Sequence, residues 1–274
     1  MLLMLALLAV CSAAFILYQS WRGRALDTQP PVITVPSEPL ELSVQDDPAQ
    51  LLQGIRAYDA KDGDVTPSVV VESVYGAVAQ RQFQVTYAAF DRAGNVAKAK
   101  RAVLYTDYES PRFSLSAPLI FRPSGTSDIF GVLDAADVFD GSLKDRIKGT
   151  ILSGEGQIYE LGEHVVQFRV TNSLGDTAYL TAPVLVTDQA DNAAITLTQY
   201  LVYLEPEDAF DAAEYLDSWQ AGAQRTRLHG TDGSIKVQID DPVDTSVPGT
   251  YCVEYTAESG QYHARTRLIV VVEE

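Results

Sequence analysis

The stretch RQFQVTYAAFDRAGNVAKAKRAVLYTD, residues 81–107, decides the fold. Apolar and polar residues alternate on both sides of a short segment that contains Gly94 and Asn95. Period-two alternation predicts strands with one buried face. Glycine and asparagine tolerate the left-handed backbone that a tight turn needs. The stretch therefore predicts two antiparallel strands joined by a short turn.

The same pattern occurs twice more along the chain. GEHVVQFRVTNSLGDTAYLTAPVLVTD covers residues 162–188, and PGTYCVEYTAESGQYHARTRLIVVVEE covers residues 248–274. A repeat of roughly 80 residues fits a small β-sandwich better than a solenoid unit. We therefore expect three tandem domains, over residues 31–108, 109–189 and 190–274.

Each repeat also has an Asp-Gly pair before an apolar residue. The three stretches are AKDGDVT at 60–66, VFDGSLK at 138–144 and GTDGSIK at 230–236. Asp-Gly is a strong turn signal because glycine accepts positive φ and the aspartate can bond the backbone beyond it. Two further stretches, 126–139 and 206–219, occupy equivalent places, and each predicts a short helix or turn on the domain flank.

The first repeat, AYDAKDGDVT…FQVTYAAFDRAGNVAKAKRAVLYTD, resembles the bacterial Ig-like surface domains first catalogued in a pesticidal crystal protein. Their hallmark is Asp-Gly-Asp before a strand, then Tyr-x-Val-x-Tyr, Asp-x-Ala-Gly-Asn, and a strand ending in Asp. The third repeat keeps VPGTYCVEYTA but has ESGQ in the loop. The second keeps only the pattern of two alternating strands around a turn, with NSLGD in the turn. The resemblance implies an all-β fold of tandem Ig-like antiparallel β-sandwiches in an extracellular setting. It implies no reaction, because sandwich folds host many functions.

The N-terminal residues form a long apolar run, MLLMLALLAVCSAAFILYQSW, that carries no charge from residue 2 to residue 18. This length is at the lower limit for a membrane-spanning helix. We predict a signal anchor or transmembrane helix over residues 1–24 and a proline-rich spacer over 25–38. A cleaved signal peptide and a lipoprotein signal at Cys11 are the alternatives.

The expected location is the cell membrane, with a single pass and extracellular β-domains. Arg22 and Arg24 follow the apolar run, and the positive-inside rule read alone would place the β-domains in the cytoplasm. The extracellular expectation therefore rests on the family resemblance and on the hypothesis that the true start codon, with the usual basic residues, lies upstream.

Charge and cysteine content restrict the partners. The chain has 20 Lys+Arg against 37 Asp+Glu, a net charge of −17, whereas nucleic-acid binding needs a basic face. An acidic excess is typical of a solvated surface and also suits divalent cations or a cationic partner. The two cysteines, Cys11 and Cys252, provide neither a disulfide framework nor a thiolate metal site.

The acidic segment at residues 58–64 has two interpretations. Calcium prefers several carboxylate and carbonyl oxygens, and the candidate ligands are Asp59, Asp62 and Asp64, with Asp107 at the domain junction. The other interpretation is a turn before a strand, because all three repeats keep Asp-Gly while the number of acids falls. The FDRAGN segment has the same two interpretations, a second oxygen cluster around Asp91 or a turn.

The sequence contains no nucleophile elbow, zinc-protease motif or phosphate-binding glycine loop, so we expect no enzyme. The function that we expect is adhesion, spacing or protein–protein assembly at the bacterial cell surface. The alternative is a carbohydrate-binding or accessory module of a surface polysaccharide system. An exposed row of aromatic residues would favour this alternative, and the candidates are Tyr179, Tyr200, Tyr203, Tyr215 and Tyr262.

Overall fold

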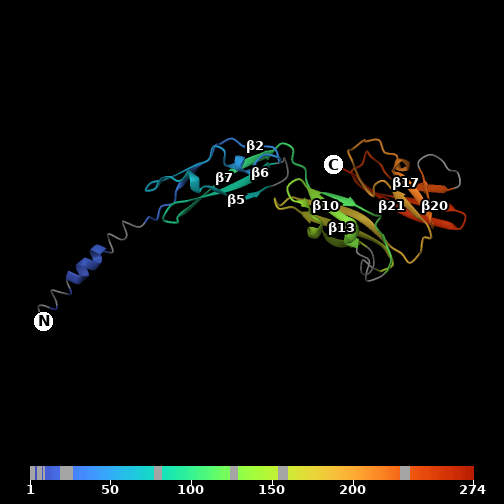
Figure 1. Ribbon diagram of the computed structural model, residues 1–274, viewed down its shortest axis with the longest axis horizontal. Helices are drawn as coiled ribbons and strands as arrows, with labels where there is room; N and C mark the ends of the chain where they lie inside the picture. Colours follow the sequence, from blue (N-terminus) through green and yellow to red (C-terminus); the bar gives the residue numbers. More distant parts are fainter. Residues whose placement is uncertain are drawn as a thin grey trace. The chain divides into compact units, whose positions relative to one another are not determined.

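The computed structural model of the protein describes residues 4, 8, 10–18, 27–76, 82–123, 129–153, 160–228 and 235–274. The chain divides into two compact units, Met1–Tyr108 and Glu109–Glu274. The first unit contains one β-sandwich and the second contains two (Figure 1). The prediction of an all-β chain of tandem Ig-like sandwiches is thus confirmed.

The first sandwich has seven strands in a three-stranded and a four-stranded sheet, the strand count of a constant-type Ig domain. The smaller sheet, in the order β1-β3-β4, comprises β1 (Val32–Thr34), β3 (Arg56–Asp59) and β4 (Gly63–Asp64). The larger sheet, in the order β2-β7-β6-β5, comprises β2 (Leu40–Leu42), β7 (Val96–Tyr105), β6 (Gln82–Phe90) and β5 (Val70–Tyr75). Two 3₁₀ turns, η1 (Pro48–Leu52) and η2 (Thr66–Ser68), lie between the strands.

The second sandwich repeats this topology. Its smaller sheet comprises β8 (Arg112–Leu115), β10 (Leu133–Asp137) and β11 (Gly141–Ser142). Its larger sheet, in the order β12-β13-β14-β9, comprises β12 (Lys148–Ser153), β13 (Gly162–Thr171), β14 (Thr177–Val186) and β9 (Ile120–Phe121). The 3₁₀ turns are η3 (Ile129–Val132) and η4 (Lys144–Arg146).

The third sandwich has the same arrangement once more. Its smaller sheet comprises β15 (Ala194–Leu197), β17 (Leu216–Ala221) and β18 (Gln224–Arg227). Its larger sheet, in the order β16-β21-β20-β19, comprises β16 (Leu201–Leu204), β21 (Tyr262–Val272), β20 (Gly249–Ser259) and β19 (Lys236–Asp240). The 3₁₀ turn η5 (Ala212–Tyr215) precedes β17.

The expectation of purely antiparallel sheets needs a correction. In each sandwich the second strand pairs in parallel with the last one, as β2 with β7, β9 with β14 and β16 with β21. The first alternating segment of each repeat is split, because the chain leaves one sheet after β1, β8 or β15 and enters the other. In the first sandwich Pro36 and Pro39 lie at this crossing, where a residue without an N–H donor ends strand pairing.

The sandwich cores come from the alternating faces that the sequence predicts. A fully buried aromatic residue occupies the same register in each repeat: Tyr87, Phe168 and Tyr255. The Tyr87 hydroxyl donates to the Leu51 carbonyl at 2.7 Å, and the Tyr255 hydroxyl donates to the Ala212 carbonyl at 2.8 Å. Each bond ties a 3₁₀ turn to the larger sheet. Phe168 has no hydroxyl and packs edge-on against Phe130 instead.

The second and third sandwiches share apolar side chains across their boundary. Leu201 and Ile269 belong to strands of the third sandwich, yet both are part of the hydrophobic core of the second. Ile269 is 1% exposed. On the polar side of this boundary, Arg267 is 8% exposed and donates to Glu163 at 2.8 Å and to Glu254 at 2.9 Å. The two sandwiches therefore form one continuous packed body.

Two helix predictions need comment. The prediction of a short helix or turn holds at both places: η5 lies within residues 206–219, where Asp211 accepts from the Ala213 N–H before β17 begins, and η3 lies within the described part of residues 126–139. In the predicted anchor, residues 10–18 are helical, and much of 1–24 lies outside the described residues. Among the described residues no helix has both the length and the apolar character of a membrane span.

Candidate metal centre

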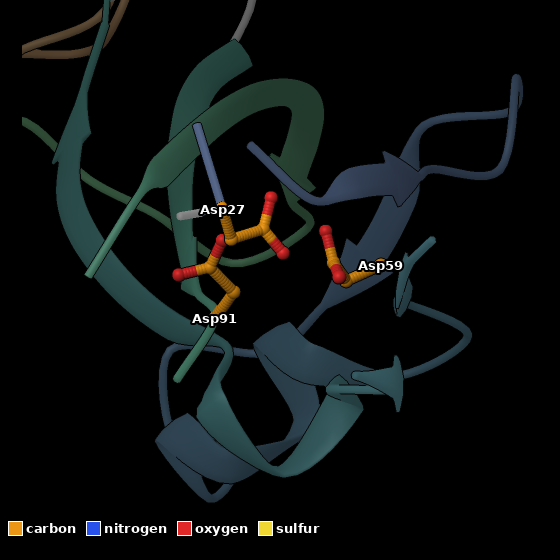
Figure 2. A group of neighbouring side chains, drawn as sticks. All are labelled: Asp27, Asp59 and Asp91. Atoms are coloured by element: carbon orange, nitrogen blue, oxygen red, sulfur yellow. The ribbon is translucent and has the colours of Figure 1, made fainter. Parts of the chain in front are cut away.

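Three aspartates meet at one end of the first sandwich. Figure 2 shows the carboxylates of Asp27, Asp59 and Asp91 pointing toward one another, and one oxygen from each lies within 4.8 Å of the others. Asp59 is 2% exposed and Asp91 is 8% exposed. Buried carboxylates in mutual contact repel one another and require a compensating cation, proton or donor. The group, which we call the aspartate triad, is therefore a candidate cation site.

A tight turn at the end of β3 positions Asp59. Its Oδ1 atom accepts the backbone N–H groups of Lys61 at 2.8 Å and Asp62 at 2.9 Å. The turn closes through Gly63, whose φ of 78° lies in the left-handed region that favours glycine. This is the turn that the Asp-Gly pair predicts, and it fixes the position of Asp59 at the triad.

The β6–β7 hairpin supplies Asp91. Its Oδ1 atom accepts the Asn95 backbone N–H at 2.8 Å, and its Oδ2 atom accepts the Asn95 side-chain amide at 2.7 Å. Burial acts to raise the pKa of Asp91, but these bonds, with those from the backbone of Gly94 and Ala93, hold this pKa below its usual value. Asp91 therefore stays ionised at neutral pH beside two further carboxylates.

Asp27 reaches the triad from the segment before β1. The Asn95 side-chain amide donates to the Asp27 carbonyl at 3.2 Å and to the Gln29 carbonyl at 3.3 Å, and so holds this segment against the hairpin. The Lys61 ammonium lies 4.0 Å from the Asp27 carboxylate and is itself half exposed. One exposed lysine balances only part of the charge of three carboxylates.

The donor set has the chemistry of a hard-cation site. Carboxylate oxygens are the ligands that Ca²⁺ and Mg²⁺ prefer, whereas zinc sites are built with histidine or cysteine. Ca²⁺ accepts irregular geometry and takes six to eight oxygens, with water completing the shell. The triad provides three carboxylates from three separate segments, and this arrangement suits calcium better than the strict octahedron of magnesium.

The structure brings only one of the four sequence-predicted ligands into the triad, Asp59. Asp62 accepts the Arg92 backbone N–H at 2.7 Å, and Asp64 accepts the Thr66 N–H at 2.9 Å, so both serve turns. Asp107 follows β7, whereas Asp91 precedes it, and a ten-residue strand spans about 30 Å. At that far end Asp107 accepts from Ser43 at 2.7 Å.

The second sandwich contains a matched arrangement without the extra charge. Asp137 corresponds to Asp59, and Asn172 replaces Asp91 at the same distance along the strand from the buried aromatic residue. The Asn172 amide donates to the Asp137 carboxylate at 2.6 Å. In the second sandwich an amide N–H donor thus faces the aspartate. In the first sandwich a second carboxylate stands at the same position.

A second aspartate of this matched arrangement remains charged. Asp140, which corresponds to Asp62, accepts the Ser173 N–H at 2.7 Å and pairs with Arg146 at 2.8 Å. Burial acts to raise the pKa of Asp140, but the Ser173 bonds and the Arg146 charge lower it below the usual value. This carboxylate therefore contributes a pH-dependent link between the turn and the hairpin.

The third sandwich has neither acid. Ala221 and Ser259 occupy the positions of Asp59 and Asp91. A pocket of about 280 Å³ opens there. The same end of three related sandwiches thus carries a carboxylate group, a hydrogen-bonded pair and a pocket.

The chain matches no family model and no curated protein. The resemblance to the crystal-protein domains therefore stays a prediction. Solved structures with some similarity include the protocadherin GammaB4 extracellular domain, at 12% identity over 90% of this chain and 50% of that chain, with a TM-score of 0.20.

Two further solved structures also show some similarity. The structure of CBM51-2 in complex with GlcNAc and INT domains from Clostridium perfringens ZmpB has 15% identity over 89% of this chain and 42% of that chain, with a TM-score of 0.23. Mouse cadherin-23 EC22-24 has 12% identity over 89% of this chain and 98% of that chain, with a TM-score of 0.21. At these TM-scores none of the three carries an argument about this chain.

Proposed function

We propose that the protein is a non-enzymatic spacer of the cell envelope, whose tandem Ig-like sandwiches hold binding surfaces for adhesion or assembly with other proteins. The observation that carries the proposal is the shared core of the second and third sandwiches, through Leu201 and Ile269. A spacer must resist bending between its domains, and a continuous apolar core resists bending better than a polar, hydrated contact. The extracellular location belongs to the proposal and rests on the sequence.

Polar contacts at the same boundary support the proposal. Arg112 of β8 donates to Glu273 at 2.9 Å, and its guanidinium lies 5.0 Å from the centre of the Tyr203 ring. The Phe113 backbone N–H donates to the Tyr203 hydroxyl at 3.2 Å. These contacts join the first strand of the second sandwich to β16 and to Glu273, near the C-terminus, of the third. They fix the rotation of one sandwich about the other, which the apolar contacts alone do not define.

A coupling experiment tests the proposal. Leu180 is buried in the second sandwich and Trp219 in the third. In a Trp21→Phe background, Trp219 is the single tryptophan and reports urea unfolding of the third sandwich. Leu180→Ala removes about 2–5 kcal/mol from the stability of the second sandwich. If the two sandwiches form one stiff unit, the urea midpoint reported by Trp219 also falls in Leu180→Ala.

The control for this experiment is Leu42→Ala, an equivalent truncation of a buried leucine in the first compact unit. We expect it to leave the Trp219 midpoint unchanged. A Trp219 midpoint that is also unchanged in Leu180→Ala, while circular dichroism shows a separate early transition, would refute a single stiff unit.

We further propose that the aspartate triad binds Ca²⁺ and thereby fastens the segment before β1 to the end of the first sandwich. The support is the contrast with the second sandwich, where Asn172 supplies a donor that Asp91 does not. Because Asp27 comes from the segment that leads into the sandwich, an ion held by all three residues crosslinks this segment to two loops. The first sandwich then resists bending at its N-terminal side.

Isothermal titration calorimetry of the full chain with CaCl₂ tests this proposal. With three carboxylates, we expect a dissociation constant in the range of about 10⁻⁴–10⁻³ M that is typical of extracellular modules. Asp91→Asn should abolish the heat of binding, since asparagine already occupies the matched position in the second sandwich. Asp244→Asn, which removes a turn aspartate of the third sandwich, should leave it unchanged. Binding that is equal in both variants would exclude the triad.

A further inference from the structure

The described residues that line the pocket at the end of the third sandwich are all neutral. Besides apolar atoms from residues such as Ala221, five of the lining residues carry hydrogen-bonding groups, namely Trp219, Gln224, Thr226, Gln261 and Tyr262. No Asp, Glu, Lys, Arg or His is among its described lining residues.

The replacement of acids by small residues explains why the pocket exists. Ala221 and Ser259 stand where the first sandwich has Asp59 and Asp91, and each removes part of the volume of a carboxylate. Trp219 takes the position of Ala57 and Ala135 in the smaller sheets, and its indole forms part of the wall. The sequence differences that remove the cation site therefore create a cavity with an aromatic wall.

The chemistry of the lining selects a class of ligand. A ring that carries hydroxyl groups around its edge and C–H groups on its faces can use both kinds of surface, the amide and hydroxyl groups of the pocket and the exposed aromatic ring of Tyr262. Charged ligands find no counter-ion among the described lining residues. At about 280 Å³ the pocket is just below the range of drug-sized sites, and so takes one ring rather than an extended chain.

We propose that this pocket binds a single neutral sugar residue of a glycan. The site is independent of the spacer role and of the aspartate triad, since it uses neither the shared core nor the first sandwich. It also differs from the aromatic row that the sequence suggested. Tyr200 and Tyr215 pack against the third core, and Tyr203 packs at the boundary with the second sandwich. Of those tyrosines only Tyr262 lines the pocket.

Saturation-transfer-difference NMR on the full chain tests the proposal. The probes are glucose, galactose and N-acetylglucosamine, with galacturonic acid as the charged counterpart. We expect signals from at least one neutral sugar and weaker signals from the acid. In the Trp21→Phe background the same sugar should change the fluorescence of Trp219, which places binding at this pocket.

Two exposed positions serve for substitution, so that folding is preserved. Tyr262→Ala should weaken binding about tenfold through the loss of ring contact, and Gln224→Ala should weaken it less. The matched control is Tyr179→Ala, an exposed tyrosine of the second sandwich. We expect it to leave binding unchanged.

Three outcomes would overturn the assignment. They are the absence of saturation transfer from every neutral sugar, binding that Tyr262→Ala leaves intact, and preferential binding of the acid. None of these outcomes bears on the coupling between the sandwiches, which the Leu180→Ala experiment measures separately.

Discussion

Calcium should raise the thermal stability of the first sandwich, and Asp91→Asn should remove this effect. In the parent chain without calcium, the three carboxylates of the triad repel one another at distances within 4.8 Å. Addition of the ion removes this repulsion and joins three segments. In Asp91→Asn the new amide can donate to Asp59, as the Asn172 amide donates to Asp137 at 2.6 Å. The variant should therefore be indifferent to calcium.

The size of the effect follows from mass action. A ligand present at about 100 times its dissociation constant stabilises the folded state by about 2.7 kcal/mol. For a dissociation constant of about 10⁻⁴ M, this condition is met near 10 mM calcium. For a domain of 60–100 residues each kcal/mol corresponds to about 4–8 °C in the melting temperature. The first sandwich should thus melt roughly 10–20 °C higher in calcium than in chelator.

Differential scanning calorimetry of the full chain is the appropriate assay, because the first compact unit is separate from the second and should melt as its own transition. Only this transition should move with calcium. Asp64→Asn is the internal control, since Asp64 serves its own turn and should leave the calcium shift in place. An equal calcium shift in Asp91→Asn and in the parent would refute the triad as the site. A parent transition that stays fixed at 10 mM calcium would refute calcium binding of this strength.

Three further substitutions test other contacts. Tyr255→Phe leaves the buried Ala212 carbonyl without its donor and should lower the free energy of unfolding by about 1–3 kcal/mol, as measured by urea denaturation with Trp219 fluorescence. Arg267→Met breaks two ion pairs in which only the arginine is buried. In the same assay the free energy of unfolding should fall by about 1–3 kcal/mol. An unchanged midpoint would mean that water fully solvates the two glutamates in the variant. Because the pKa of Asp140 is lower in the folded than in the unfolded chain, its stabilisation is complete above the unfolded value of about 3.9 and is lost as the pH falls through the folded value. Acid titration of the parent and Asp140→Asn should show a smaller acid-induced loss in the variant, and parallel curves would contradict this linkage.

The sequence predicts the sandwiches because their signal is local. Alternation in residues 81–107 gives two strands directly, and the glycines at 63 and 141 take the positive φ values that their turns require, 78° and 66°. The third Asp-Gly pair, Asp232 and Gly233, lies outside the described residues. Each of these features depends on neighbours within a few positions, so periodicity and turn chemistry suffice to predict it.

The triad could not be read from the sequence in the same way. Asp27, Asp59 and Asp91 are distant from one another along the chain, and they meet only because the Asn95 amide holds the leading segment against the hairpin. Spacing within the acidic segment pointed instead to Asp62 and Asp64, whose side chains serve turns. The signal that was available is the comparison of repeats, in which Asp91 stands opposite Asn172.

The shared core had a sequence signal of another kind. β21 ends in an uninterrupted apolar run, Leu268 to Val272, whereas one-sided strands alternate. Continuous apolar residues indicate a strand that is buried on both faces. Here the second face is covered by the second sandwich, and the run marks the boundary where Ile269 enters its neighbour's core.

The parallel pairing of the second strand with the last strand in each sandwich has a mechanical consequence. The ends of a sandwich that carry tension are its first strands and its last strand, and these are bonded side by side through β2 and β7, β9 and β14, or β16 and β21. When the two ends are pulled apart, the parallel strands slide along each other, and their hydrogen bonds are loaded together in shear. An antiparallel hairpin pulled from its open end would instead lose its bonds one after another. Each sandwich thus resists pulling along the chain through hydrogen bonds that are loaded together.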